Sequence, residues 1–149
     1  MFGFFLTSIL YLLLGFIMKK EFPKQSKGFH PYGELIGLSF TELGKGFSEC
    51  LIEVDKRLFN PHKVLHGGII YSMADTGMGG ALYSLLEEDE LCATIEVKIN
   101  YFKSVREGTL TCRTKVIHKG KNVAVLESEV KNEDHIVAKA IGTYMIFKV

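Results

Sequence analysis

The chain has 149 residues, of which 47% are hydrophobic, and its formal net charge is +1. A chain of this length can bury a substantial core, so we expect one domain, and its near-neutral charge excludes a strong overall field for nucleic acid. Cys50, Cys92 and Cys112 are odd in number and widely spaced. This pattern is typical of reduced thiols in a cytosolic protein.

Residues 1–18 form an apolar run without a charged side chain, and Lys19 and Lys20 follow it. The run is marginal in length for a membrane span and lacks the flanking features of a secretory signal. Two explanations stay open: a membrane anchor whose following lysines hold the chain in the cytoplasm, or a misassigned start. Residues 19–33 predict a linker, and residues 34–149 the folded domain.

The remaining chain predicts two strands, one long helix and four further strands, in that order. Apolar and polar residues alternate in the expected strands, at 35–42, 47–55, 94–102, 109–118, 122–131 and 136–147. A helical period predicts the helix over residues 68–86, and its main face, rich in glycine and alanine, can lie close to a sheet. This order predicts an α+β fold in which one antiparallel sheet wraps around one central helix.

Asp75 lies off the main apolar face of this helix. The residues expected beside it are Tyr71, Ser72, Met78, Gly79 and Leu82. That second face is neither core-like nor plainly solvated. We therefore expect it to form a subunit interface or to line a cleft.

The start of the helix is a candidate site for an oxyanion. Gly67 and Gly68 leave backbone N–H groups open to a ligand, and the helix dipole there favours negative charge. The alternative is a tight turn, with Asp75 a polar surface residue. Asp75 is the most plausible reactive group, and Asn60 and Thr94 are candidate polar helpers.

Other chemistries lack the residues they need. His62 and His66 have the spacing of a zinc pair, but Lys63 stands where the hydrolase motif requires Glu. The segment 77–79 lacks the third glycine and the preceding strand of a dinucleotide site. The chain contains no Gly-x-Ser-x-Gly motif. We expect no metal and no cofactor.

The spacing of Asp75 and Gly67 constrains the site. They are about two helical turns apart, roughly 10 Å. One carbonyl group cannot lie within about 3 Å of both groups of the same chain. Either the two have unrelated roles, or a second subunit supplies Asp75, and the mixed face around Asp75 favours the second option.

Between residues 33 and 147 the chain resembles the hotdog-fold thioesterases, in particular the PaaI-like acyl-CoA thioesterases. The resemblance is carried by Asn60, His66-Gly67-Gly68, Asp75 and Thr94. It implies a hotdog fold, in which a sheet wraps a long helix. It also implies a homodimer or homotetramer with active sites at subunit boundaries.

The resemblance also implies roles for these residues. The Gly67 amide would polarise the thioester carbonyl, assisted by the Asn60 side chain. Asp75 of the second chain would act as general base or as nucleophile, and Thr94 would orient the water. His66 would fix the loop. The residues implied for the coenzyme A nucleotide are Lys119, Gly120, Lys121, Asn122, Lys103 and Arg106.

The leading hypothesis is hydrolysis of acyl-CoA to free acid and coenzyme A, which makes coenzyme A part of the substrate. A non-catalytic acyl-CoA-binding protein is a second hypothesis; such a sensor would normally carry a DNA-binding or partner domain, and we expect none in this sequence. A hotdog 3-hydroxyacyl dehydratase or hydratase is a third, and it would need a catalytic histidine. Tyr71, Met73, Met78 and Leu82 are compatible with aryl and with medium-chain acyl groups.

Overall fold

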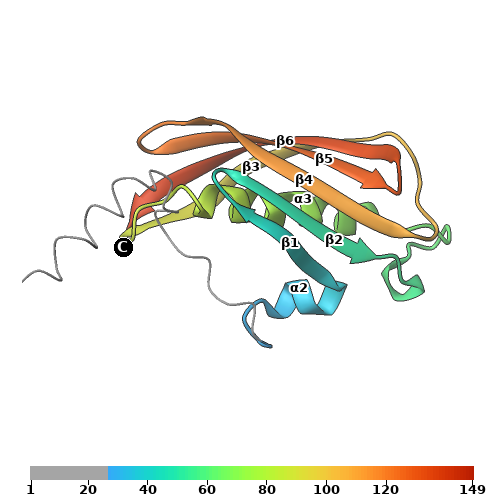
Figure 1. Ribbon diagram of the computed structural model, residues 1–149. Coiled ribbons are helices and arrows are strands. Elements are labelled where there is room, and N and C mark those ends of the chain that lie inside the picture. The colour runs from blue at the N-terminus through green and yellow to red at the C-terminus, as the bar shows by residue number, and fades with distance from the viewer. Residues whose placement is uncertain (1–26) are drawn as a thin grey trace, which may run out of the picture.

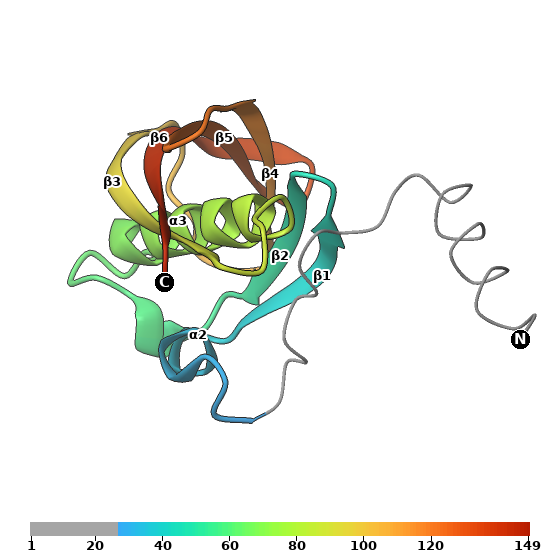
Figure 2. The same ribbon diagram turned by 90° about the vertical axis from the view of Figure 1, so that its left-hand side faces the viewer.

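A computed structural model describes residues 27–149, in which a six-stranded sheet curves around one long helix (Figures 1 and 2). The elements are α2 (Pro31–Ile36), β1 (Leu38–Gly44), β2 (Phe47–Glu53), η1 (Lys56–Leu58), α3 (Gly67–Tyr83), β3 (Glu90–Tyr101), β4 (Thr109–Lys119), β5 (Val123–Asn132) and β6 (His135–Lys148). The strand order is β1-β2-β4-β5-β6-β3, and every neighbouring pair is antiparallel. The predicted α+β hotdog fold is confirmed.

Helix α3 lies close to the sheet at Gly77. An added Cβ there would lie 2.8 Å from Thr114 Oγ1, and Ser48 Oγ donates a hydrogen bond to the Gly77 carbonyl at 2.7 Å. Thr114 and Ser48 are buried, so only a residue without a side chain lets the helix approach the sheet this closely.

The predicted positions of two residues of α3 are wrong. Met78 and Leu82 were expected on the mixed face beside Asp75, but both are fully buried in the core. An added Cβ at Gly142 of β6 would lie 2.5 Å from Met78 Sδ, so this thioether fills the space that the glycine leaves. The sheet curves far enough around α3 to bury a wider arc of the helix than one stripe.

Alanine substitutions at two glycines of α3 should change stability in opposite directions. Gly77→Ala should lower the free energy of unfolding by about 1 kcal/mol or more, because the overpacking exceeds the gain in helix propensity. Gly79→Ala should raise it by about 0.5–1 kcal/mol, because nothing lies within 4 Å of an added Cβ there. Urea denaturation of both variants beside the wild type measures the difference. Equal shifts would contradict the close approach at Gly77.

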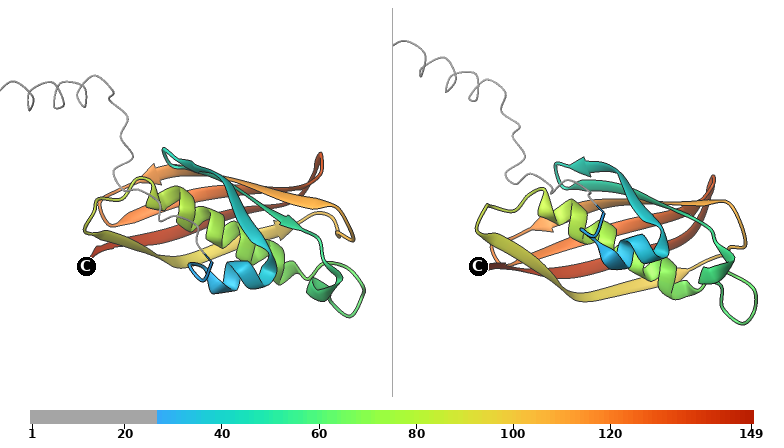
Figure 3. Two further views of the ribbon diagram at one scale, coloured as in Figure 1. Left: turned by 60° about the horizontal axis from the view of Figure 1, so that its bottom comes forward. Right: turned by 90° about the horizontal axis from the view of Figure 1, so that it is seen from below.

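The start of the domain differs from the prediction. Residues 31–36 form a short helix, whereas a linker up to residue 33 and a strand from residue 35 were expected. Pro31 suits the first turn of a helix, and Gly37 ends it in the left-handed conformation with φ 73°. The helix α2 lies over the side of α3 that the sheet leaves open (Figure 3), where the Tyr32 hydroxyl is 2.8 Å from Ser72 Oγ.

The apolar run of residues 1–18 lies outside the described residues, as does most of the expected linker. No helix within residues 27–149 is both long and apolar enough to cross a membrane. All three cysteines are free thiols, and two of them, Cys50 and Cys112, are buried.

Strand β3 forms one edge of the sheet and is longer than predicted, since it begins at Glu90 rather than at Thr94. Its pairing with β6 is irregular between Thr94 and Glu96, which interrupts the strict alternation expected there. Ile95 is 57% exposed and Tyr101 is 48% exposed. The strand therefore presents apolar side chains along an edge that carries no further strand within residues 27–149.

Candidate active site

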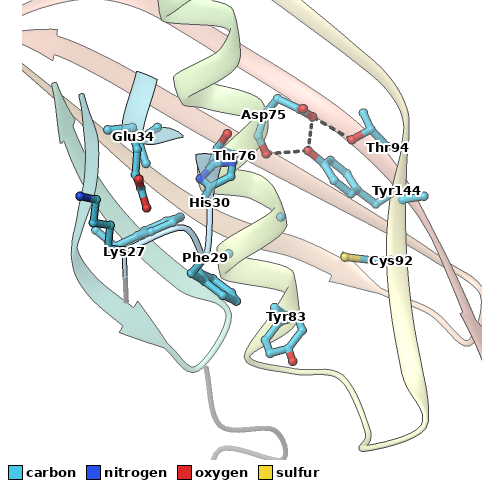
Figure 4. Close-up of a pocket in the computed structure, with 15 residues that line it drawn as sticks. Lys27, Phe29, His30, Glu34, Asp75, Thr76, Tyr83, Cys92, Thr94 and Tyr144 are labelled. Atoms are coloured by element: carbon cyan, nitrogen blue, oxygen red, sulfur yellow. Dashed lines mark hydrogen bonds between the residues drawn. The ribbon is translucent and has the colours of Figure 1, made fainter. Parts of the chain in front are cut away.

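Side chains from two strands meet Asp75 of helix α3 (Figure 4). Thr94 Oγ1 of β3 donates a hydrogen bond to Asp75 Oδ1 at 2.8 Å. The Tyr144 hydroxyl of β6 lies close to the same carboxylate oxygen and is 2.8 Å from the Asp75 backbone carbonyl. Asp75 Oδ2 has no hydrogen-bond partner among residues 27–149 and can act on a ligand. The carboxylate is thus fixed in orientation with one oxygen available.

Tyr144 is a functional candidate that the sequence analysis did not identify. Burial, and then the neighbouring Asp75 carboxylate, raise the pKa of the Tyr144 hydroxyl far above its ordinary value. Tyr144 therefore stays protonated, and its hydroxyl remains a donor toward Asp75. The signal in the sequence was a tyrosine among small residues on the inward row of β6, where Ala138, Ala140 and Gly142 precede it.

Removing the Tyr144 hydroxyl should slow the reaction without unfolding the protein. Tyr144→Phe should lower kcat by about tenfold to a hundredfold, the value of a hydrogen bond to a charged group. Tyr32→Phe is the matched control, because it removes a hydroxyl that contacts α3 at Ser72 instead. Thiol release and circular dichroism of both variants provide the measurement. A Tyr144→Phe enzyme with the kcat of the control would contradict a role in holding Asp75.

Asp75 opens into a cavity of about 790 Å³ that runs over α3 (Figure 4). The lining residues are Lys27, Phe29, His30, Glu34, Leu38, Phe40, Asp75, Thr76, Gly79, Gly80, Tyr83, Cys92, Ala93, Thr94 and Tyr144. A mostly apolar cavity with a few convergent polar groups is the usual form of a small-molecule site. Asp75 is the carboxylate within it that belongs to α3.

Helix α3 begins at the two glycines, Gly67 and Gly68. His66 is the N-cap, and its Nδ1 accepts a hydrogen bond from the Gly68 N–H at 2.9 Å. The Tyr101 hydroxyl donates to the Gly67 carbonyl at 3.0 Å. Within the described residues the Gly67 N–H has no hydrogen-bond partner, so it can donate to a ligand.

Asn60 lies in the loop before this helix and is half-buried. Its Oδ1 accepts a hydrogen bond from the His62 N–H at 2.9 Å, which fixes the side chain and leaves its NH₂ group to donate. His62 and His66 lie in this loop and at the helix cap. Among residues 27–149 no three His, Cys, Asp or Glu side chains cluster as metal ligands would.

The two halves of the predicted site lie apart in one chain. Thr94 contacts Asp75, but Asn60, His66 and Gly67 do not line the cavity that contains Asp75. Asp75 lies eight positions after Gly67 in the helix, a rise of about 12 Å. One chain therefore does not bring the free amide and the carboxylate to one carbonyl group.

The charges predicted for the nucleotide also separate. Lys119 is the last residue of β4 and Lys121 lies in the β4–β5 turn, and Lys119 Nζ is 3.9 Å from Glu90 Oε2 at the start of β3. Lys103 and Arg106 lie in the loop between β3 and β4, at the other end of the sheet. The eleven residues of β4 between the two groups span roughly 35 Å. In one chain the four charges do not form one patch.

Comparisons with known proteins agree with this fold. Residues 62–139 match the model of the thioesterase superfamily. A protein of Saccharolobus solfataricus, provisionally named an esterase, is 30% identical over 140 residues, which cover 93% of this chain and 90% of that one. A protein of Salmonella typhimurium named medium/long-chain acyl-CoA thioesterase YigI is 27% identical and covers 78% of this chain and 85% of its own.

Solved structures have the same fold. The conserved protein PA5202 of Pseudomonas aeruginosa matches with a TM-score of 0.80 and 36% identity, over 84% of this chain and all of its own. The PaaI protein of the Escherichia coli phenylacetic acid degradation operon matches with a TM-score of 0.73 and 25% identity, over 80% of this chain and 84% of its own. The chain belongs to the thioesterase superfamily and is a PaaI-like hotdog thioesterase, an enzyme that hydrolyses thioesters.

Proposed function

We propose that this enzyme hydrolyses acyl-CoA thioesters to the free acid and coenzyme A. The observation that carries the proposal is the Asp75 carboxylate, held by Thr94 and Tyr144 at the wall of a large, mostly apolar cavity. Two reactive roles are open to it. As general base, Asp75 removes a proton from the attacking water. As nucleophile, it attacks the carbonyl itself and forms an anhydride that water then hydrolyses.

Both routes place negative charge on the carbonyl oxygen. The Gly67 N–H at the helix start, which has no partner in the described part of the chain, supplies a donor to that oxyanion, and the Asn60 amide assists. When the tetrahedral intermediate collapses, the C–S bond breaks and the coenzyme A thiolate leaves and takes up a proton. His66 holds the loop through its bond to the Gly68 N–H.

The separation of Gly67 and Asp75 supports a site shared by two chains. The exposed edge of β3 carries Ile95 and Tyr101, and it can pair with the same edge of a second copy. A two-fold axis pairs such edges antiparallel. The Gly67 end of one chain then approaches the Asp75 end of its partner.

The same symmetry gathers the nucleotide charges. It brings the Lys119–Asn122 turn of one chain to the end of the dimer where the partner contributes Lys103 and Arg106. The phosphates of coenzyme A would then bind between the two chains. A homodimer is the smallest assembly with complete sites, and a homotetramer would contain two such dimers.

Removing the positive charges of Lys119 and Lys121 should weaken substrate binding more than catalysis. Lys119→Ala combined with Lys121→Ala should raise KM for acyl-CoA severalfold and leave kcat little changed, because a phosphate contact far from the carbonyl acts equally in ground and transition states. Steady-state kinetics at two salt concentrations provide the measurement, and the difference should shrink at high salt. Lys45→Ala, in the β1–β2 turn, is the matched control. An unchanged KM would place the nucleotide elsewhere.

An assay for the release of free coenzyme A from acyl-CoA by the purified protein tests the function. A thioesterase releases thiol from acyl-CoA in many turnovers. An acyl-CoA-binding protein would bind the same compounds without releasing thiol, and a dehydratase or hydratase would change the acyl chain and leave the thioester intact. Thiol detection and mass spectrometry on one reaction separate the three. Absence of thiol release across short, medium, long and aryl thioesters would overturn the proposal.

A further inference from the structure

The cavity over α3 has a polar end and an apolar end. Asp75, Thr94 and Tyr144 form the polar end (Figure 4). Tyr83 lies two helical turns further along α3, with Phe29 near it, at the end away from the carboxylate. The cavity therefore extends lengthwise along the helix from the reacting group, instead of enclosing it in a compact pocket.

Apolar side chains, bare helix backbone and the polar side chain of Thr76 line the path between the two ends. Leu38 and Phe40 of β1 border it on one side and Cys92 of β3 on the other. The charged lining residues Lys27 and Glu34 are solvent-exposed, so they lie at the mouth of the cavity. A ligand that follows this path meets mainly apolar surface.

Gly79 and Gly80 form the part of α3 along this path. They differ in the space that an added side chain would find. A Cβ at Gly80 would lie 2.8 Å from the Phe40 ring, so packing against β1 explains that glycine. A Cβ at Gly79 would meet nothing within 4 Å, and glycine costs a helix about 1 kcal/mol relative to alanine. The packing of residues 27–149 does not require a glycine at position 79, and its absent side chain leaves open space beside the helix that a ligand can occupy.

We propose that this groove, from Asp75 past Gly79 to Tyr83, binds a linear aliphatic acyl chain of medium length. This inference rests on the proposed thioester hydrolysis and names its acyl group. The rise from Asp75 to Tyr83 is about 12 Å, and an extended chain advances roughly 1.3 Å per bond, which corresponds to about eight to ten carbons. A benzoyl group ends before it reaches the apolar end and leaves that end unfilled.

The wild-type enzyme should therefore prefer longer chains up to that length. Between butanoyl-CoA and decanoyl-CoA, kcat/KM should rise by up to about fourfold per added methylene, the effect of its burial. The rise should stop near ten carbons, where the chain reaches Tyr83 and Phe29. Benzoyl-CoA should be a poorer substrate than decanoyl-CoA.

A side chain at Gly79 should shorten the groove. Gly79 lies about 6 Å beyond Asp75, or roughly four to five carbons into the groove. Gly79→Leu should lower kcat/KM for decanoyl-CoA by a factor on the order of 10 to 100 relative to butanoyl-CoA, and Gly79→Ala should have a smaller effect in the same direction. Ser39→Leu is the matched control, because Ser39 is exposed and lies between Leu38 and Phe40 on β1, so it points to the opposite face.

The outcomes separate this inference from the function on which it rests. A Gly79→Leu enzyme with butanoyl-CoA preferred over decanoyl-CoA, beside a Ser39→Leu enzyme with the wild-type preference, supports the groove. Equal losses on both substrates in Gly79→Leu, or a wild-type enzyme that is indifferent to chain length or prefers benzoyl-CoA, overturn it while thioester hydrolysis stands. If no thioester is hydrolysed, the proposed function fails, and this inference fails with it.

Discussion

Asp75→Asn should leave a folded protein whose turnover of acyl-CoA falls by a factor of about 10² to 10⁴, the contribution of a positioned general base. The change removes the charge and the basicity of the side chain and keeps its shape. Thr94 and Tyr144 can still donate hydrogen bonds to the amide oxygen, as they do to the carboxylate. The same loss is expected if Asp75 is the nucleophile, because an amide attacks a thioester poorly.

A nearby carboxylate provides the control for this variant. Glu34 lines the same cavity but is exposed on α2, away from the Thr94 and Tyr144 hydroxyls. Glu34→Gln should keep kcat within about twofold of the wild type, the small effect usual for surface changes. Thiol release and thermal unfolding of both variants provide the measurement. Wild-type turnover by a folded Asp75→Asn protein would show that another group carries the reaction.

The fold could be predicted because the long helix and most strands carry a strong local signal. The strand alternation of residues 109–118 and 136–147 and the helical pattern after Gly68 agree with the observed elements to within a few residues. The short helix α2 was missed because Leu35 and Ile36 continue an apolar pattern into β1. Its boundaries are set by Pro31 and by the left-handed Gly37.

The site was harder to predict because tertiary contacts define it. Tyr144 is distant from Asp75 in sequence, and only the pairing of β6 with β3 brings it to the carboxylate. Met78 and Leu82 were misplaced because a helical wheel cannot show how far a curved sheet extends around the helix. The opposite positions of Lys103 and Lys119 became clear only from the strand order.

The shared site is the claim on which the mechanism depends, and complementation between two inactive variants tests it. Asn60→Ala and Asp75→Ala should each be nearly inactive, because each variant places one defect in every site of its homodimer. In a mixed dimer one site carries both defects and the other carries neither. Random pairing makes about half of the dimers mixed, and each has one intact site of two.

The most direct measurement is therefore thiol release after the two variants are unfolded together, refolded as an equal mixture, and shown by native mass spectrometry to contain mixed dimers. The control is each variant refolded alone. If the Gly67 loop with Asn60 and the Asp75 carboxylate come from different chains, roughly a quarter of wild-type activity should return. If both come from the same chain, every site in the mixture carries a defect, and activity should stay at the level of the separate variants.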